Sequence, residues 1–130
     1  MRKLEQQLGS AIWLRDLSGY KAMKALLETD PRPDGVFCYS HPSAMGAMQA
    51  ITECGLRVPQ DVAVIGCGNV LQAQFFRVPL SSVDQNSAEL GRSAGERAQS
   101  LIGHKMPRPK TILLKSKVIA RESTIGRLRL

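Results

Sequence analysis

Two stretches of this 130-residue sequence end an apolar run in small or polar residues that could contact a ligand. They read V-I-G-C-G-N at residues 64–69 and F-C-Y-S-H at residues 37–41. Ligands of parallel α/β proteins bind at the carboxyl ends of buried strands. The first stretch is therefore compatible with a binding edge, with a phosphate-binding loop, or only with a tight turn.

A dinucleotide-binding loop is disfavoured by the residues that follow. The fingerprint G-x-G-x-x-G requires a third glycine, and that position holds Leu71. No clear helical pattern follows the turn, although the pyrophosphate of such ligands lies at a helix N-terminus. A binding edge or a plain turn remains.

Catalytic chemistry is disfavoured as well. A serine, histidine and acid set could be drawn from Ser40, His41 and either Asp16 or Asp84, but the sequence contains no nucleophile elbow. The three cysteines form no C-x-x-C pair, and no cluster with metal-ligand spacing is evident. The sequence predicts a protein that is not an enzyme and that uses no metal and no cofactor.

The charge and the hydropathy of the chain limit the kinds of partner that it can have. Eighteen lysines and arginines against eleven acids give a net charge of +7, but the basic residues are scattered, which favours a solvated surface over a DNA-binding face. No apolar tract reaches the roughly 18 residues that could cross a membrane. Residues 1–10 lack the apolar core of a signal peptide, and an odd number of cysteines is typical of a reducing compartment. We expect a cytoplasmic location.

Periodicity and turn residues predict an α/β fold. The expected elements are a helix over 16–30, a strand over 35–40, a helix over 41–55, a strand over 62–65, an irregular segment over 69–80, a strand over 81–85, a helix over 86–103 with Asn86 and Glu89 as an imperfect capping box, and one or two strands over 110–122. Alternating strands and helices imply a parallel sheet with right-handed crossovers. The element count is low for a complete doubly wound domain, so we expect part of a larger two-lobed architecture.

Three groups of apolar residues are candidates for contacts beyond the core. Phe75 and Phe76 are adjacent in an irregular segment, which predicts that at least one points outward, toward a second subunit. The helix over 41–55 is apolar on more than one face. The helix over 86–103 carries one apolar stripe, which consists of Leu90, Ala94, Ala98 and Leu101. Separately, Trp13 could either stack on a ligand or belong to the core.

The chain resembles the C-terminal part of bacterial regulators of the lactose-repressor/galactose-repressor family. The resemblance runs from Trp13 to Gly126 and rests on P-D-G-V-F-C-Y-S-H-P-S-A-M-G-A-M, on R-V-P-Q-D-V-A-V-I-G-C-G-N, on R-V-P-L-S-S-V-D-Q and on the closing R-E-S-T. It implies a lobe of a type I periplasmic-binding-protein-like core. Over 1–130 we expect the C-terminal lobe and final crossover, with the DNA-binding domain and most of the first lobe absent.

The resemblance also implies a role for V-I-G-C-G-N. Relatives bind a small-molecule effector between their lobes, and they carry acids where this chain has His41 and Gly68. Among sugars, sugar acids and phosphosugars, we therefore expect an effector that carries an acceptor or a negative charge, with His41 as a candidate donor. A degenerate site without an effector is the alternative. The ligand-binding residues implied by the resemblance are Trp13, Leu14, Ser40, His41, Gly68, Asn69 and Gln85.

The expected function is effector sensing and dimerisation in a transcription regulator that contacts DNA only through the absent domain. The resemblance places a homodimer interface on Met45, Met48, Gln49, Phe75 and Phe76. It also implies that the stripe of the helix over 86–103 packs on the first lobe in relatives, so that here it lacks its usual cover. A fragment of a solute-binding protein that serves transport is the alternative.

Overall fold

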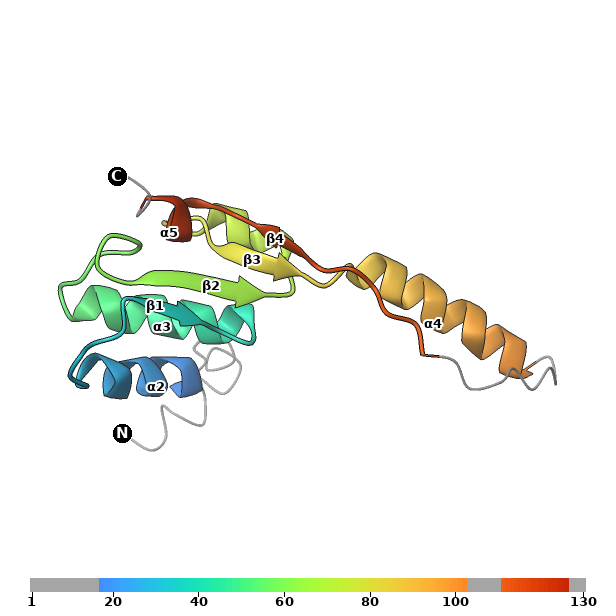
Figure 1. Ribbon diagram of the computed structural model, residues 1–130, viewed down its shortest axis with the longest axis horizontal. Helices are drawn as coiled ribbons and strands as arrows, with labels where there is room; N and C mark the ends of the chain where they lie inside the picture. Colours follow the sequence, from blue (N-terminus) through green and yellow to red (C-terminus); the bar gives the residue numbers. More distant parts are fainter. Residues whose placement is uncertain (1–16, 103–110, 127–130) are drawn as a thin grey trace, which may run out of the picture.

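The computed structural model describes residues 17–102 and 111–126. In this part of the chain, four strands form one sheet in the order β1-β2-β3-β4. The first three strands are parallel, and β4 runs antiparallel to β3 (Figure 1). The predicted α/β fold with a mostly parallel sheet is confirmed. The strands are β1 (Gly35–Phe37), β2 (Ala63–Cys67), β3 (Ser81–Asp84) and β4 (Lys117–Ile119).

The three long predicted helices are present, and α2 and α3 lie together below the sheet in Figure 1. A 3-10 helix occupies the segment predicted to be irregular. The short helix after β4 was not predicted, because four residues are too few to show a helical period. The elements are α2 (Leu17–Leu27), α3 (His41–Glu53), η2 (Leu71–Phe75), α4 (Ser87–Ile102) and α5 (Glu122–Ile125).

The core lies between α3 and the sheet and is extended by α2. Its largest fully buried apolar side chains are Met23, Ile51, Val62, Val64 and Leu80. Alanines 44, 47 and 50 form the buried face of α3, which lets the helix approach β2 closely. Val62 and Val64 lie on the same face and are both fully buried, whereas Ala63, Ile65 and Cys67 alternate with them on the opposite face and are only half-buried.

Buried serine hydroxyls attach the C-terminal segment to the sheet. Ser123 is fully buried; its hydroxyl donates to the carbonyl of Val64 at 2.6 Å and accepts from the backbone N–H of Ser81 at 2.8 Å. Both bonds satisfy groups that would otherwise be costly to bury. The start of α5 is therefore fixed to β2 and β3, 40 or more residues earlier in the chain.

Helix α4 extends away from the sheet as an arm (Figure 1). None of its residues is buried, and Leu90 and Leu101 are each 56% exposed. The helix borders a shallow apolar hollow of about 340 Å³ together with Ile112 and Leu114. Among the described residues the predicted stripe is thus largely uncovered. Asn86 precedes the helix with φ of +57°, so it lacks the extended backbone that a capping box uses.

The described residues contain no helix long and apolar enough to cross a membrane.

Candidate functional site

The carboxyl ends of the three parallel strands bring five of the seven predicted ligand residues to one edge of the sheet. Ser40 and His41 follow β1, Gly68 and Asn69 follow β2, and Gln85 follows β3. We call this set the ligand edge. The two other predicted residues, Trp13 and Leu14, lie outside the described residues.

Local geometry explains why the chain turns at these points. The Ser40 hydroxyl caps α3 by accepting from the N–H of Ser43 at 3.3 Å, so His41 stands in the first turn of the helix. Gly68 has φ of +107°, which side chains other than hydrogen rarely allow, and its N–H donates to the carbonyl of Val83 at 2.8 Å. A Cβ at Gly68 would lie 3.7 Å from Nδ1 of His41. A side chain at this position would therefore lie in van der Waals contact with the imidazole.

His41 is an unusual residue of the edge, because it is 5% exposed and only one of its two ring nitrogens has a hydrogen-bond partner among the described residues. The ring is hydrogen-bonded to the backbone of Cys67, whereas Nε2 is buried without a hydrogen-bond partner among the described residues. With its proton on Nδ1, directed at the Cys67 carbonyl, a neutral imidazole presents Nε2 as an acceptor. The edge thus contains an unused buried acceptor, and buried polar atoms of this kind call for an explanation.

Burial lowers the pKa of His41 below its ordinary value of 6.5, and the nearby positive charge of Arg121 lowers it further, against the opposing effect of the Cys67 bond. Below pH 6.5 the unfolded chain takes up a proton that the folded chain does not, so stability falls on acidification. We predict that the unfolding midpoint of the native chain drops more than that of His41→Phe between pH 7.5 and pH 5.5. Chemical denaturation at each pH measures this difference, and parallel curves would contradict it.

Asn69 is held on both sides by hydrogen bonds. Its side-chain oxygen accepts from Nη2 of Arg121 at 2.8 Å, and its Nδ2 donates to Asp84 at 3.2 Å. Its backbone N–H donates to the hydroxyl of Ser82 at 2.9 Å, in a left-handed conformation with φ of +46°. Only one side-chain N–H of Asn69 is left for a ligand. Most of its hydrogen bonding serves to shape the edge.

Four residues near the edge were not assigned to it from the sequence. Phe37 is the last residue of β1 and Tyr39 lies two residues later, and they are 60% and 71% exposed. Such rings can stack on a flat ligand or on a sugar face. Asp84 and Arg121 join the edge through Asn69. The apolar run at 35–40 indicated a strand, but it did not show that the rings of Phe37 and Tyr39 face solvent. Only the position of these residues in the sheet reveals that.

The structure gives no support to a catalytic arrangement at the edge. The Nδ1 position of His41 is occupied by the backbone of Cys67, so no carboxylate orients the ring as a triad requires. Within residues 17–102 and 111–126, no group of three or more His, Cys, Asp or Glu side chains could hold a metal ion. What the edge can do is to accept and donate hydrogen bonds in a fixed geometry.

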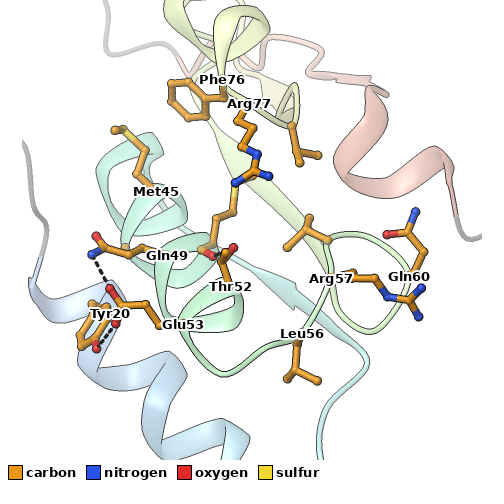
Figure 2. Close-up of a pocket in the computed structure, with 14 residues that line it drawn as sticks. Tyr20, Met45, Gln49, Thr52, Glu53, Leu56, Arg57, Gln60, Phe76 and Arg77 are labelled. Carbon is orange, nitrogen blue, oxygen red and sulfur yellow. Dashed lines mark hydrogen bonds between the residues drawn. The ribbon is translucent and has the colours of Figure 1, made fainter.

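A second surface contains four of the five predicted interface residues. A groove of about 850 Å³ separates the outer face of α3 from the segments around residues 57–60 and 76–78, and none of the ligand-edge residues lines it. Figure 2 shows Met45 and Gln49 on one side of the groove and Phe76 on the other. Met48 also lines it, whereas Phe75 does not and is 76% exposed. We call this groove the α3 groove.

The polar part of the α3 groove is ordered by hydrogen bonds. The carboxylate of Glu53 accepts from the hydroxyl of Tyr20 at 2.6 Å and from the amide of Gln49 at 2.7 Å (Figure 2). Arg57 pairs with Asp61 at 3.0 Å on the far side. The α3 groove combines an apolar floor with a polar rim, and protein interfaces have a similar composition.

Comparison with known proteins identifies the family. The model of the periplasmic binding protein-like domain matches residues 3–124. The HTH-type transcriptional repressor PurR of Mannheimia succiniciproducens is 41% identical over 105 residues, which are 81% of this chain and 31% of that protein. The PurR of Yersinia enterocolitica is 42% identical over 106 residues, with 82% and 31% coverage.

Solved structures of regulators have the same fold. A complex of the transcriptional regulator CelR with cellobiose is 32% identical, with a TM-score of 0.76 over 82% of this chain and 32% of that one. The lac repressor dimer bound to operator and the anti-inducer ONPF is 27% identical, with a TM-score of 0.74 over 85% and 38%. The relatives with printed functions are transcription regulators and not enzymes.

The chain spans about a third of the length of the curated relatives that it matches. The family match itself covers nearly the whole chain, and the relatives named above are all transcription regulators. The chain belongs to the periplasmic binding protein-like domain family, in the group formed by the effector-binding cores of lactose-repressor/galactose-repressor regulators.

Proposed function

We propose that this chain is the second lobe and final crossover of the effector-binding core of a bacterial transcription regulator, and that it has no enzymatic activity of its own. The observation that carries the proposal is the unpartnered Nε2 of His41 at the carboxyl ends of three parallel strands, where this fold binds ligands. A cytoplasmic location follows from that role. The DNA-binding domain and most of the first lobe would come from other parts of the regulator.

The polarity of the ligand edge favours a neutral ligand rich in hydroxyl groups. The neutral imidazole of His41 offers an acceptor, and Asp84 adds a carboxylate. The charge of Arg121 is already directed at Asn69 and at the carbonyl of Leu80. An anionic sugar acid or phosphosugar would find no unused cation among these residues, whereas a sugar hydroxyl could donate to Nε2. The cellobiose bound by the CelR relative belongs to the favoured class.

A regulator of this type would work as a homodimer through the α3 groove. An isologous contact would place the same groove on both subunits, with Phe76 and Met45 at its centre. Effector binding at the edge would then change the relative setting of the lobes, and with it the spacing of two DNA-binding domains.

The ligand proposal is tested by thermal unfolding in the presence of cellobiose, lactose, gluconate and glucose 6-phosphate at equal millimolar concentrations. His41→Phe is the matched control, because it keeps the ring and removes the acceptor. A ligand that binds only the folded state raises the midpoint by mass action. We expect a neutral saccharide to raise the midpoint of the native chain more than that of the variant. A larger rise with either anion, or equal rises in the two chains, would refute this ligand class.

A further inference from the structure

Arg121 lies in the turn between β4 and α5, and its backbone is fixed to β3. Its N–H donates to the hydroxyl of Ser81 at 2.7 Å, and its carbonyl accepts from the same hydroxyl at 3.0 Å. Ser81 is fully buried. The backbone of Arg121 therefore has a defined position from which its side chain can extend along the sheet.

The guanidinium of Arg121 bonds to two segments that precede it by about 40 and 50 residues. Nη1 donates to the carbonyl of Leu80 at 2.7 Å, and Nη2 donates to the side-chain oxygen of Asn69 at 2.8 Å. Asn69 in turn donates to Asp84 at 3.2 Å. One planar group thus connects the start of β3, the turn after β2 and the end of β3.

This connection acts on a turn of the ligand edge with an uncommon backbone conformation. Asn69 has φ of +46° directly after Gly68 with φ of +107°, and positive φ values are uncommon outside glycine, with asparagine among the residues that adopt them most readily. Such a turn persists where surrounding bonds determine it. Three hydrogen bonds fix Asn69: the side-chain bond from Arg121, the side-chain bond to Asp84 and the backbone bond to Ser82.

We propose that Arg121 is a positioning residue of the ligand edge: it fixes Asn69, and through it Asp84, in the orientation that a ligand meets beside His41. The assignment of a ligand to the edge rests on the proposed function, but the positioning itself does not. The charge of Arg121 also favours the neutral form of His41. The C-terminal turn is therefore part of the edge as well as the end of the fold.

The substitutions Arg121→Lys and Arg121→Gln separate the two effects of the guanidinium. Lysine keeps the charge but cannot hold two acceptors in one rigid plane, and glutamine removes the charge. Arg92→Lys is the matched control, because Arg92 pairs with Glu89 and Glu96 on the distant arm α4. All chains are used in full length and without ligand.

The readouts are the NMR signals of the Asn69 side-chain amide and backbone N–H, and the titration of the His41 ring. We expect both Arg121 variants to shift the Asn69 signals and to speed exchange of its backbone N–H at least tenfold. Only Arg121→Gln should raise the pKa of His41. Arg92→Lys should change none of these signals. Unchanged Asn69 signals in a folded Arg121→Lys chain would overturn the proposal.

Asn69→Gly keeps the proposal testable if an Arg121 variant does not fold. Glycine tolerates the positive φ, removes the acceptor and leaves the bond from Arg121 to Leu80 in place. We expect this chain to be folded, with shifted signals of Asp84 and Gln85. No change at Asp84 would contradict the chain of bonds. If Asn69 responds to Arg121 but no saccharide shifts any signal, the positioning role holds and the proposed ligand is wrong.

Discussion

Replacing Phe76 with glutamate is expected to convert the proposed dimer into a monomer. Phe76 lines the α3 groove opposite Met45, and a two-fold interface buries it twice. Fully burying an exposed side chain of this kind contributes about 1.5 to 3 kcal/mol, and Phe76 is already half-buried, so its two copies would contribute at most about 3 to 6 kcal/mol, a factor of at most about 10² to 10⁴ in the dissociation constant. Light scattering after size-exclusion chromatography measures the mass directly.

Two further variants make this result interpretable, because Phe76 also packs against the core. Met45→Glu changes the opposite side of the groove at a residue that is 38% exposed, and it should give a monomer as well. Leu113→Glu introduces the same charge at a residue that is 90% exposed and lies outside the groove, and it should leave the mass unchanged. A dimer that survives both groove substitutions would place the interface elsewhere.

Replacing Gly19 with alanine is expected to cause the largest loss of stability from a single methyl group. A Cβ at Gly19 would lie 2.2 Å from the carbonyl oxygen of Ser43 and 2.7 Å from its Cα. Backbone atoms cannot rotate away, so α2 and α3 must separate. We expect a net loss of about 2 to 3 kcal/mol in the free energy of unfolding, although alanine favours the helix by about 1 kcal/mol. Urea denaturation measures the change.

Gly91→Ala is the matched control for the packing argument. Gly91 is also a helical glycine, but nothing lies within 4 Å of the Cβ that would be added. The same change should therefore stabilise the chain by about 0.5 to 1 kcal/mol through helix propensity alone. If Gly19→Ala stabilised the chain as Gly91→Ala is expected to do, close contact of α2 with α3 at Gly19 would be excluded.

The elements with a clear period were predictable. The apolar spacing over 16–30 and 86–103 predicted α2 and α4, and the run Val62–Ile65 predicted the central strand β2. These elements are determined by local pattern, since a helix face and a buried strand each leave their own repeat in the sequence. The positions of Ser40, His41, Gly68 and Asn69 at strand ends followed from the same pattern.

The contacts that shape the ligand edge could not be predicted in this way. Arg121 reaches Asn69 across 52 residues, and no local pattern indicates such a bond. The hydrogen bonds of the Ser81 hydroxyl could not be predicted either, because a buried serine and an exposed one look alike in a sequence. The acceptor state of His41 depends on the carbonyl of Cys67. The sequence suggested His41 as a donor to an anionic ligand, whereas the proposed function gives it the role of an acceptor.

The proposed function requires a ligand contact at the carboxyl ends of β1, β2 and β3. The most direct measurement is a two-dimensional ¹H–¹⁵N NMR titration of the full chain with cellobiose. We predict that shifts concentrate at His41, Gly68 and Asn69, that residues of the α3 groove stay unchanged, and that His41→Phe abolishes the shifts. Shifts centred on Met48 and Arg77 of the groove, or no shifts at millimolar cellobiose, would contradict the account.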